Sequence, residues 1–189
     1  MIELEVIVKG TTEEETNILC SNLVKEISDS YIRFIGENMV YKCLLDKFTG
    51  SEVLFDILEQ KYSMGIYMVL TYTESYMDQI TETMNRITTK TINVPGNEET
   101  PVIVEITPSV SIIDIVLTGL SDEPMTIKNL TGGKKLIIDG EEGLVTVDGV
   151  NKFNDTDMWE FPRLKPGANT ITVSRNNVDI NIKYKPRFI

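Results

Sequence analysis

The last third of the chain is divided into short apolar segments by residues that favour tight turns. Three such segments each run into a residue pair that tolerates positive φ, as hairpin turns require. These are Leu136–Ile138 before Asp139-Gly140, Leu144–Val147 before Asp148-Gly149, and Thr170–Val173 before Asn176-Asn177. Closely spaced short strands with turn signals between them are typical of an antiparallel β-structure.

The segment Val178–Tyr184 adds a strand with one apolar face and one polar face. Val178, Ile180, Ile182 and Tyr184 alternate with Asp179, Asn181 and Lys183. Because successive side chains of a strand point to opposite faces, this strand covers a core on one side and meets water on the other. The pattern predicts an all-β sandwich.

The sequence pattern at the beginning of the chain is different and predicts an α+β domain. Ile2–Val8 reads as a strand, and Thr11-Thr12 followed by Glu14-Glu15 is a capping-box signal for a helix from Thr12 to Ile27. We expect Leu19, Leu23 and Ile27 to form the buried stripe of that helix, with Cys20 and Val24 beside it.

The middle of the chain predicts further strands and a domain boundary. The expected strands before the boundary are Tyr31–Phe34, Met39–Leu45, Val53–Leu58, Ile66–Tyr72 and Ile87–Val94, with a hairpin turn at Gly36–Asn38. Tyr76–Asn85 suggests a short helix. Pro95–Pro101 is the best candidate linker, so we divide the chain into domains 1–93 and 94–189. The strands expected after the linker begin with Val102–Ile106, Ile112–Leu117 and Met125–Lys128.

The charge of the chain disfavours direct nucleic-acid binding. The net charge is −11, with 29 acidic and 18 basic residues, whereas phosphate binding depends on lysine and arginine. An acidic surface suits a conduit from which DNA must not be retained, although solubility alone also explains it. No apolar run is long enough to span a membrane, and Met1–Glu5 has no features of a secretion signal, so we expect synthesis and folding in the cytoplasm.

The sequence contains no recognisable catalytic, cofactor or metal site. It has no histidine, and its two cysteines, Cys20 and Cys43, are expected to be buried thiols. Thr131–Lys134 lacks the spacing of a phosphate-binding loop and reads as a hairpin turn. Asp148, Asn151, Asn154, Asp155 and Asp157 would suit only calcium, and we favour turn formation. A carboxylate pair for glycoside hydrolysis is the enzyme hypothesis, but no carboxylate lies in a catalytic motif.

One stretch in the last third resembles a known family. The order WEFPRL from Trp159 to Leu164, then Lys165–Ile171 as KPGANTI, resembles the C-terminal domain of siphophage distal tail proteins, and FPxLxPGxN is its most specific part. The strand, helix and hairpin succession at the start is similar to the N-terminal domain of that family. The resemblance therefore extends over nearly the whole chain, more specifically from Thr91 to Ile189.

The resemblance implies a virion structural protein without enzymatic activity. Residues 1–93 would be an α+β domain that forms a ring, most simply a homohexamer, at the end of the tail tube. Residues 94–189 would be a galectin-like sandwich that points outward. The implied partners are the tail tube protein, a tail-tip hub protein, and receptor-binding or baseplate proteins. The alternative is a carbohydrate-binding module in which Trp159 stacks on a sugar, although we favour packing of Trp159 over the sandwich.

Overall fold

The computed structural model describes residues 1–189 and divides into two compact units. Unit 1 comprises residues 1–76 together with Ile189, and unit 2 comprises residues 77–188. Most of the chain is antiparallel β-structure, and its single α-helix lies near the N-terminus. This helix is neither long nor apolar enough to span a bilayer.

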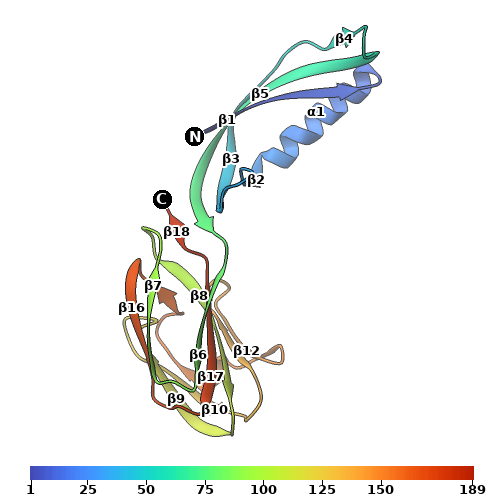
Figure 1. Ribbon diagram of the computed structural model, residues 1–189. Helices are drawn as coiled ribbons and strands as arrows, with labels where there is room; N and C mark the ends of the chain where they lie inside the picture. The colour runs from blue at the N-terminus through green and yellow to red at the C-terminus, as the bar shows by residue number, and fades with distance from the viewer. The chain divides into compact units, whose positions relative to one another are not determined.

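Unit 1 is one sheet with one helix. Its elements are β1 (Ile2–Gly10), α1 (Glu13–Ile27), β2 (Asp29–Ile32), β3 (Met39–Gly50), β4 (Leu54–Asp56) and β5 (Lys61–Met77). The strand order is β1-β5-β3-β2, and β4 pairs with β5. Figure 1 shows α1 running along one face of this sheet. The expected hairpin between β2 and β3 is confirmed, with Gly36 at φ 89° in the turn.

The helix begins where the capping signal predicts. Thr12 is the N-cap, its hydroxyl accepts the backbone N–H of Glu15 at 3.1 Å, and the Glu15 carboxylate accepts the backbone N–H of Thr11 at 2.7 Å. These bonds satisfy donors that the first helical turn leaves free.

The buried stripe of α1 differs from the expected one. Leu23 and Ile27 pack against the core, but Leu19 is 40% exposed. Thr16 and Cys20 are the fully buried residues of the helix. The face toward the sheet therefore follows Thr16, Cys20, Leu23 and Ile27, and Leu19 lies beside this face rather than on it.

Unit 2 is built from two antiparallel sheets. The five-stranded sheet has the order β14-β10-β9-β16-β7, and the seven-stranded sheet has the order β13-β12-β11-β8-β17-β6 with β15 paired to β8. The strands of the first are β14 (Thr156–Asp157), β10 (Met125–Leu130), β9 (Ile112–Thr118), β16 (Gly167–Val173) and β7 (Thr89–Val94). Those of the second are β13 (Val150–Asn151), β12 (Leu144–Val147), β11 (Leu136–Asp139), β8 (Thr100–Pro108), β17 (Val178–Tyr184), β6 (Ile80–Asn85) and β15 (Arg163–Leu164). A 3-10 turn (Phe153–Asp155) and β18 (Arg187–Phe188) complete the chain.

The two sheets of unit 2 enclose one hydrophobic core. Ile115 and Ile127 of the five-stranded sheet and Val104 and Ile182 of the seven-stranded sheet are completely buried in it. The strands of both sheets are visible around this core in Figure 1. The alternation seen in Val178–Tyr184 is confirmed, because its four apolar residues are buried and the residues between them are half-buried. The expected sandwich architecture is present.

The expected short helix at Tyr76–Asn85 is wrong. Residues 80–85 form β6, whose Met84 is completely buried against the core. Two β-branched threonines within the segment favour a strand, and pairing of β6 with β17 decides it. Local spacing of Met77, Ile80 and Met84 suits a helix, but tertiary pairing overrides that preference.

The chain divides earlier than the expected boundary between residues 93 and 94. Both β6 and β7 belong to unit 2, one at an edge of each sheet. Pro95–Pro101 joins β7 to β8 within that unit, and Gly96 adopts φ 116° there. The proline and glycine residues therefore mark the connection between the two sheets of unit 2, and not a linker between domains.

The turn signals identify turns but not which strands they join. Asp148 and Gly149 have φ of 50° and 78° and join paired strands β12 and β13, as a hairpin turn requires. Thr131–Lys134 and Asn176-Asn177 were expected to form hairpins as well, which is wrong. They join β10 to β11 and β16 to β17, and each connection passes from one sheet to the other.

Candidate assembly and binding surfaces

The sheet of unit 1 leaves a long strand edge without a partner within its own unit. On the strand path β1-β5-β3-β2, the nine-residue strand β1 pairs only with β5. The four-residue strand β2 forms the opposite end. The predicted strand at Met39–Leu45 supplies no free edge, because β3 pairs with both β5 and β2. Unpaired backbone groups at such edges are ready to pair with another strand.

The sheet of unit 1 also has one uncovered face. Leu4, Val6 and Val8 of β1 pack with Cys20 and Leu23 of α1. The alternate residues of β1 point the other way, and Ile7 among them is 66% exposed. Tyr67 of β5 lies opposite Glu5 on the same face and is also exposed. One side of this sheet therefore presents apolar and acidic side chains to its surroundings.

The FPxLxPGxN stretch closes one end of the sandwich in unit 2. Leu164 is completely buried, the Pro162 carbonyl accepts the Val102 N–H, and Arg163 N–H donates to the Leu120 carbonyl. Asn169 accepts the backbone N–H of Lys165 at 3.0 Å and donates to the Lys165 carbonyl at 2.7 Å. These bonds explain why the stretch needs a particular sequence, because its backbone must fit against several other segments of unit 2.

Gly140 lies directly against the FPxLxPGxN stretch, where a side chain would not fit. A Cβ at position 140 would lie 2.4 Å from the Pro162 carbonyl oxygen and 2.8 Å from that of Val102. Any larger residue would separate the β11 end from the docked stretch. Close backbone approach, rather than positive φ, requires this glycine.

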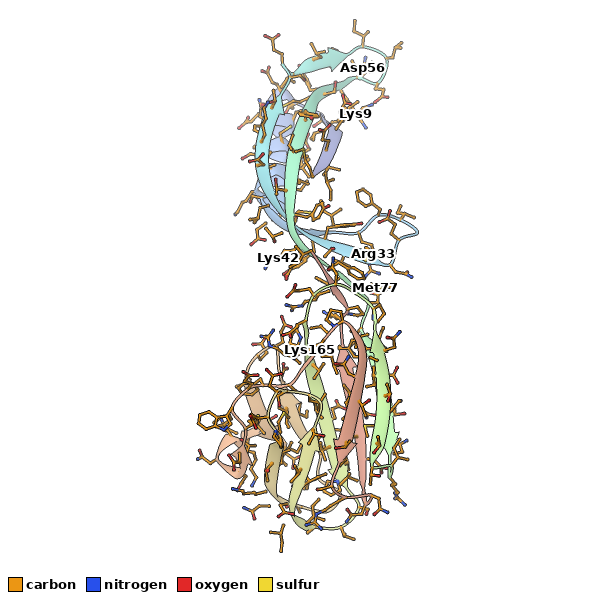
Figure 2. The ribbon with its side chains drawn as sticks, turned by 90° about the vertical axis from the view of Figure 1, so that its left-hand side faces the viewer. Lys9, Arg33, Lys42, Asp56, Met77 and Lys165 are labelled. Atoms are coloured by element: carbon orange, nitrogen blue, oxygen red, sulfur yellow. The ribbon has the colours of Figure 1, made fainter.

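Two adjoining hollows lie at the same end of unit 2, and we call them together the polar groove. Their volumes are about 220 Å³ and 520 Å³. They share the lining residues Glu99, Glu160, Phe161 and Arg163. Lys165, labelled in Figure 2, lines the smaller hollow, where it bonds Asp122 at 2.9 Å. The sequence offered no signal for Glu99 or Glu160, because only the fold brings them together.

Trp159 does not pack over the sandwich as expected. It is 88% exposed, whereas its neighbour Phe161 is half-buried and stacks on Phe153 with ring centroids 5.9 Å apart. Phe161 and Pro162 therefore occupy the packing role that we had given to Trp159, which leaves the indole on the surface.

A charged cluster crosses the outer side of the seven-stranded sheet. The Glu105 carboxylate accepts hydrogen bonds from Lys183 at 2.6 Å, Lys135 at 3.1 Å and Asn181 at 3.3 Å. Burial alone would raise the pKa of Glu105, but these three bonds outweigh it and lower the pKa to about 2. The cluster joins β8 to β17 and to Lys135, the residue that precedes β11.

The oxygen-rich segment 148–157 is used for local structure. Asp148 pairs with Lys134 at 2.6 Å, Asn151 accepts the Phe153 N–H at 2.8 Å, and Asp155 pairs with Lys152 and Asn129. Nowhere in residues 1–189 do three or more metal-binding side chains converge. The Asn151 bond and the Lys152–Asp155 pair act within the segment, whereas Lys134 and Asn129 bind it from other parts of unit 2.

Both cysteines are buried free thiols, as expected. Cys20 lies between α1 and the sheet, and Cys43 is completely buried among Ile2 and Leu70. Burial raises the pKa of both thiols, which disfavours the reactive thiolate.

The comparisons with known proteins agree with this architecture. Residues 95–188 match the family model described as the C-terminal domain of a siphovirus-type tail component. The fold is similar to the crystal structure of the distal tail protein of phage SPP1, described there as a paradigm of the hub adsorption apparatus in phages that infect Gram-positive bacteria. That likeness has a TM-score of 0.69 and 12% identity, and it covers 99% of this chain and 79% of the SPP1 chain.

No curated protein sequence matches the chain. The family model nevertheless covers the FPxLxPGxN stretch, Gly140 and the strands that they join, and the structural likeness extends through unit 1. The chain therefore belongs to the siphophage distal tail protein family, whose members are non-enzymatic structural components of the virion tail.

Proposed function

We propose that this protein forms a homohexameric ring at the distal end of the tail, with unit 1 supplying the contacts between copies. The observation that carries the proposal is the free edge of β1 at one end of the sheet path and the short β2 at the other. Two different complementary edges on one subunit allow head-to-tail contacts that close into a ring. The exposed Ile7 and Tyr67 next to that edge add apolar area to the same contact.

The remaining assignments follow from family membership. The ring would join the tail tube to a tail-tip hub protein. Unit 2, a galectin-like sandwich, would point outward and hold receptor-binding or baseplate proteins. Its β6 and β7 edges are linked by Lys90, which bonds the Thr83 carbonyl at 2.9 Å and Glu82 at 2.7 Å. A lysine across two strand edges discourages strand addition, which supports a role for unit 2 other than ring formation.

The mass of the full-length protein in solution tests the proposed ring. We expect native mass spectrometry to show a hexamer, and assembly to strengthen as salt screens the charge of −11 on each copy. Ile7→Lys places a charge beside the β1 edge and should shift the population to monomers. Ile113→Lys is the matched control, since Ile113 is 80% exposed on β9 in unit 2.

The control result separates two explanations for a monomer. If Ile113→Lys dissociates the ring and Ile7→Lys does not, unit 2 makes the contacts and the assignment of roles is reversed. If the wild type is monomeric, the test is repeated after mixing with the tail tube protein. A wild type that stays monomeric with that partner contradicts the ring.

A further inference from the structure

Trp159 is the only tryptophan of the chain and is almost fully exposed. Its exposed fraction of 88% is unusual, because tryptophan is on average highly buried. At this exposure the indole makes little contact with the rest of the fold. Such a ring is available to stack on a ligand with an apolar face.

The residue that follows Trp159 is part of the polar groove. Glu160, Glu99 and Arg163 line both hollows, and neither a hydrogen bond nor an ion pair engages the side chains of these three residues. In contrast, Lys165 is bonded to Asp122 and Glu141 to Arg187. The hydrogen bond with Asp122 raises the pKa of Lys165, and the nearby carboxylates of Glu99 and Glu160 raise it further. These two carboxylates and the Arg163 guanidinium keep their hydrogen-bonding positions open as acceptors and donors.

This combination of groups points to a particular ligand chemistry. We propose that Trp159 and the polar groove form a binding site for a neutral saccharide. The C–H face of a pyranose packs on the indole, while neighbouring hydroxyls donate to Glu99 or Glu160 and accept from Arg163. Acids outnumber bases among the groove residues, so anionic polymers such as phosphate-linked or uronic-acid chains are repelled.

A saccharide fits this site better than a polypeptide partner does. Tryptophan anchors in protein interfaces insert into well-packed apolar pockets, and the groove here is lined mainly by charged and polar groups. The larger hollow, at about 520 Å³, is of the size that small ligands occupy, and the smaller one, at about 220 Å³, adjoins it. The site lies wholly within unit 2, so it does not depend on the proposed ring.

The single tryptophan provides a direct test on the full-length protein. Its intrinsic fluorescence reports Trp159 alone, and we expect emission typical of an exposed indole with strong quenching by acrylamide. The probes are neutral oligosaccharides built from hexoses, deoxyhexoses and N-acetylhexosamines, with an oligogalacturonate and a lysine-rich peptide as counter-probes. A neutral oligosaccharide should shift the emission to shorter wavelength and protect the indole from acrylamide.

Variants assign the binding to the proposed residues. By calorimetry, Trp159→Ala should weaken binding of the positive oligosaccharide about tenfold or more, equivalent to the loss of one stacking contact. Glu160→Gln and Arg163→Ala should also weaken it, whereas Ile113→Ala, which removes an equally exposed apolar side chain, should not. Because binding uses uncharged hydroxyls, raising the salt concentration should leave the affinity unchanged.

Three results overturn the proposal. The first is that no neutral oligosaccharide of the panel binds. The second is that Trp159→Ala binds as the wild type does. The third is that the lysine-rich peptide binds in place of the saccharides and is released by salt, which would identify a basic protein partner. Native mass spectrometry of Trp159→Ala should show the same assembly as the wild type, so failure here and failure of the ring are distinguishable.

Discussion

At the scale of single residues, Glu105 shows how the fold holds a charge near the interior. The residue is 9% exposed, which disfavours an ionised carboxylate unless partners compensate. Lys183 and Asn181 of β17, and Lys135 just before β11, provide that compensation. The cluster therefore contributes to stability only while the carboxylate is ionised.

The lowered pKa of Glu105 predicts a loss of stability in acid. The folded-state pKa of about 2 lies below the ordinary value of 4.5, so the contribution is present above about pH 4.5 and is lost as the pH falls towards 2. At neutral pH the ionised carboxylate therefore contributes on the order of 3 kcal/mol to the free energy of unfolding. Denaturant unfolding followed by circular dichroism at several pH values checks this.

The variant Glu105→Gln is the control for that pH dependence. Glutamine keeps the shape but cannot ionise, so the unfolding free energy of the variant should vary less between pH 4.5 and 2 than that of the wild type. Above pH 4.5 the variant should be less stable, because two lysines lose their carboxylate. Equal slopes in the two proteins would show that other carboxylates cause the acid sensitivity.

At the scale of elements, α1 shows that apolar residues of one i, i+4 series can be buried to different extents. Leu23 packs with Cys20, Ile66 and Met68, while Leu19, one turn earlier in the same series, is 40% exposed. The sheet covers the part of the helix that contains Leu23 but not the part that contains Leu19. The burial of each leucine, rather than its identity, should therefore decide its contribution to stability.

A matched pair of substitutions in α1 tests this difference. Leu23→Ala removes volume from the core of unit 1 and should lower the free energy of unfolding by about 2 kcal/mol. Leu19→Ala makes the same chemical change in the same helix and should alter it by no more than about 0.5 kcal/mol. Chemical denaturation of both variants measures the two values. Equal effects would mean that the helix packs by the face expected from the sequence pattern alone.

At the scale of the whole molecule, the boundary between the two units follows the hydrophobic core of unit 2. Met84 and Ile92 belong to the core of unit 2, although both precede the proline-rich segment that suggests a boundary. A division between residues 76 and 77 keeps that core intact, whereas a division at 93 and 94 removes β6 and β7 from it. The two possible domain boundaries therefore predict different stabilities for the C-terminal fragment.

Two C-terminal fragments distinguish these divisions. A fragment of residues 77–189 should fold as a monomer with a cooperative thermal transition. A fragment of residues 94–189 lacks an edge strand from each sheet, leaves core residues uncovered, and should unfold at a clearly lower temperature or aggregate. Circular dichroism with light scattering measures both. Identical melting of the two fragments would contradict the assignment of β6 and β7 to the sandwich.

Several local elements of this protein can be predicted from the amino-acid sequence alone. Alternation in Val178–Tyr184, the capping pair Thr12 and Glu15, and the Asp148-Gly149 turn act through neighbouring backbone groups, and the structure confirms all three. The FPxLxPGxN stretch also indicated the family. These signals work because their physical causes lie within a few residues of chain.

The contacts between distant segments could be found only from the three-dimensional structure. It made β6 a strand by pairing it with β17, and it used Asn176-Asn177 to pass from one sheet to the other. It also left Trp159 exposed and brought Glu99 to Glu160 and Arg163 in one groove. Burial and pairing depend on which surfaces face each other across the core, and no local pattern in the sequence contains that information.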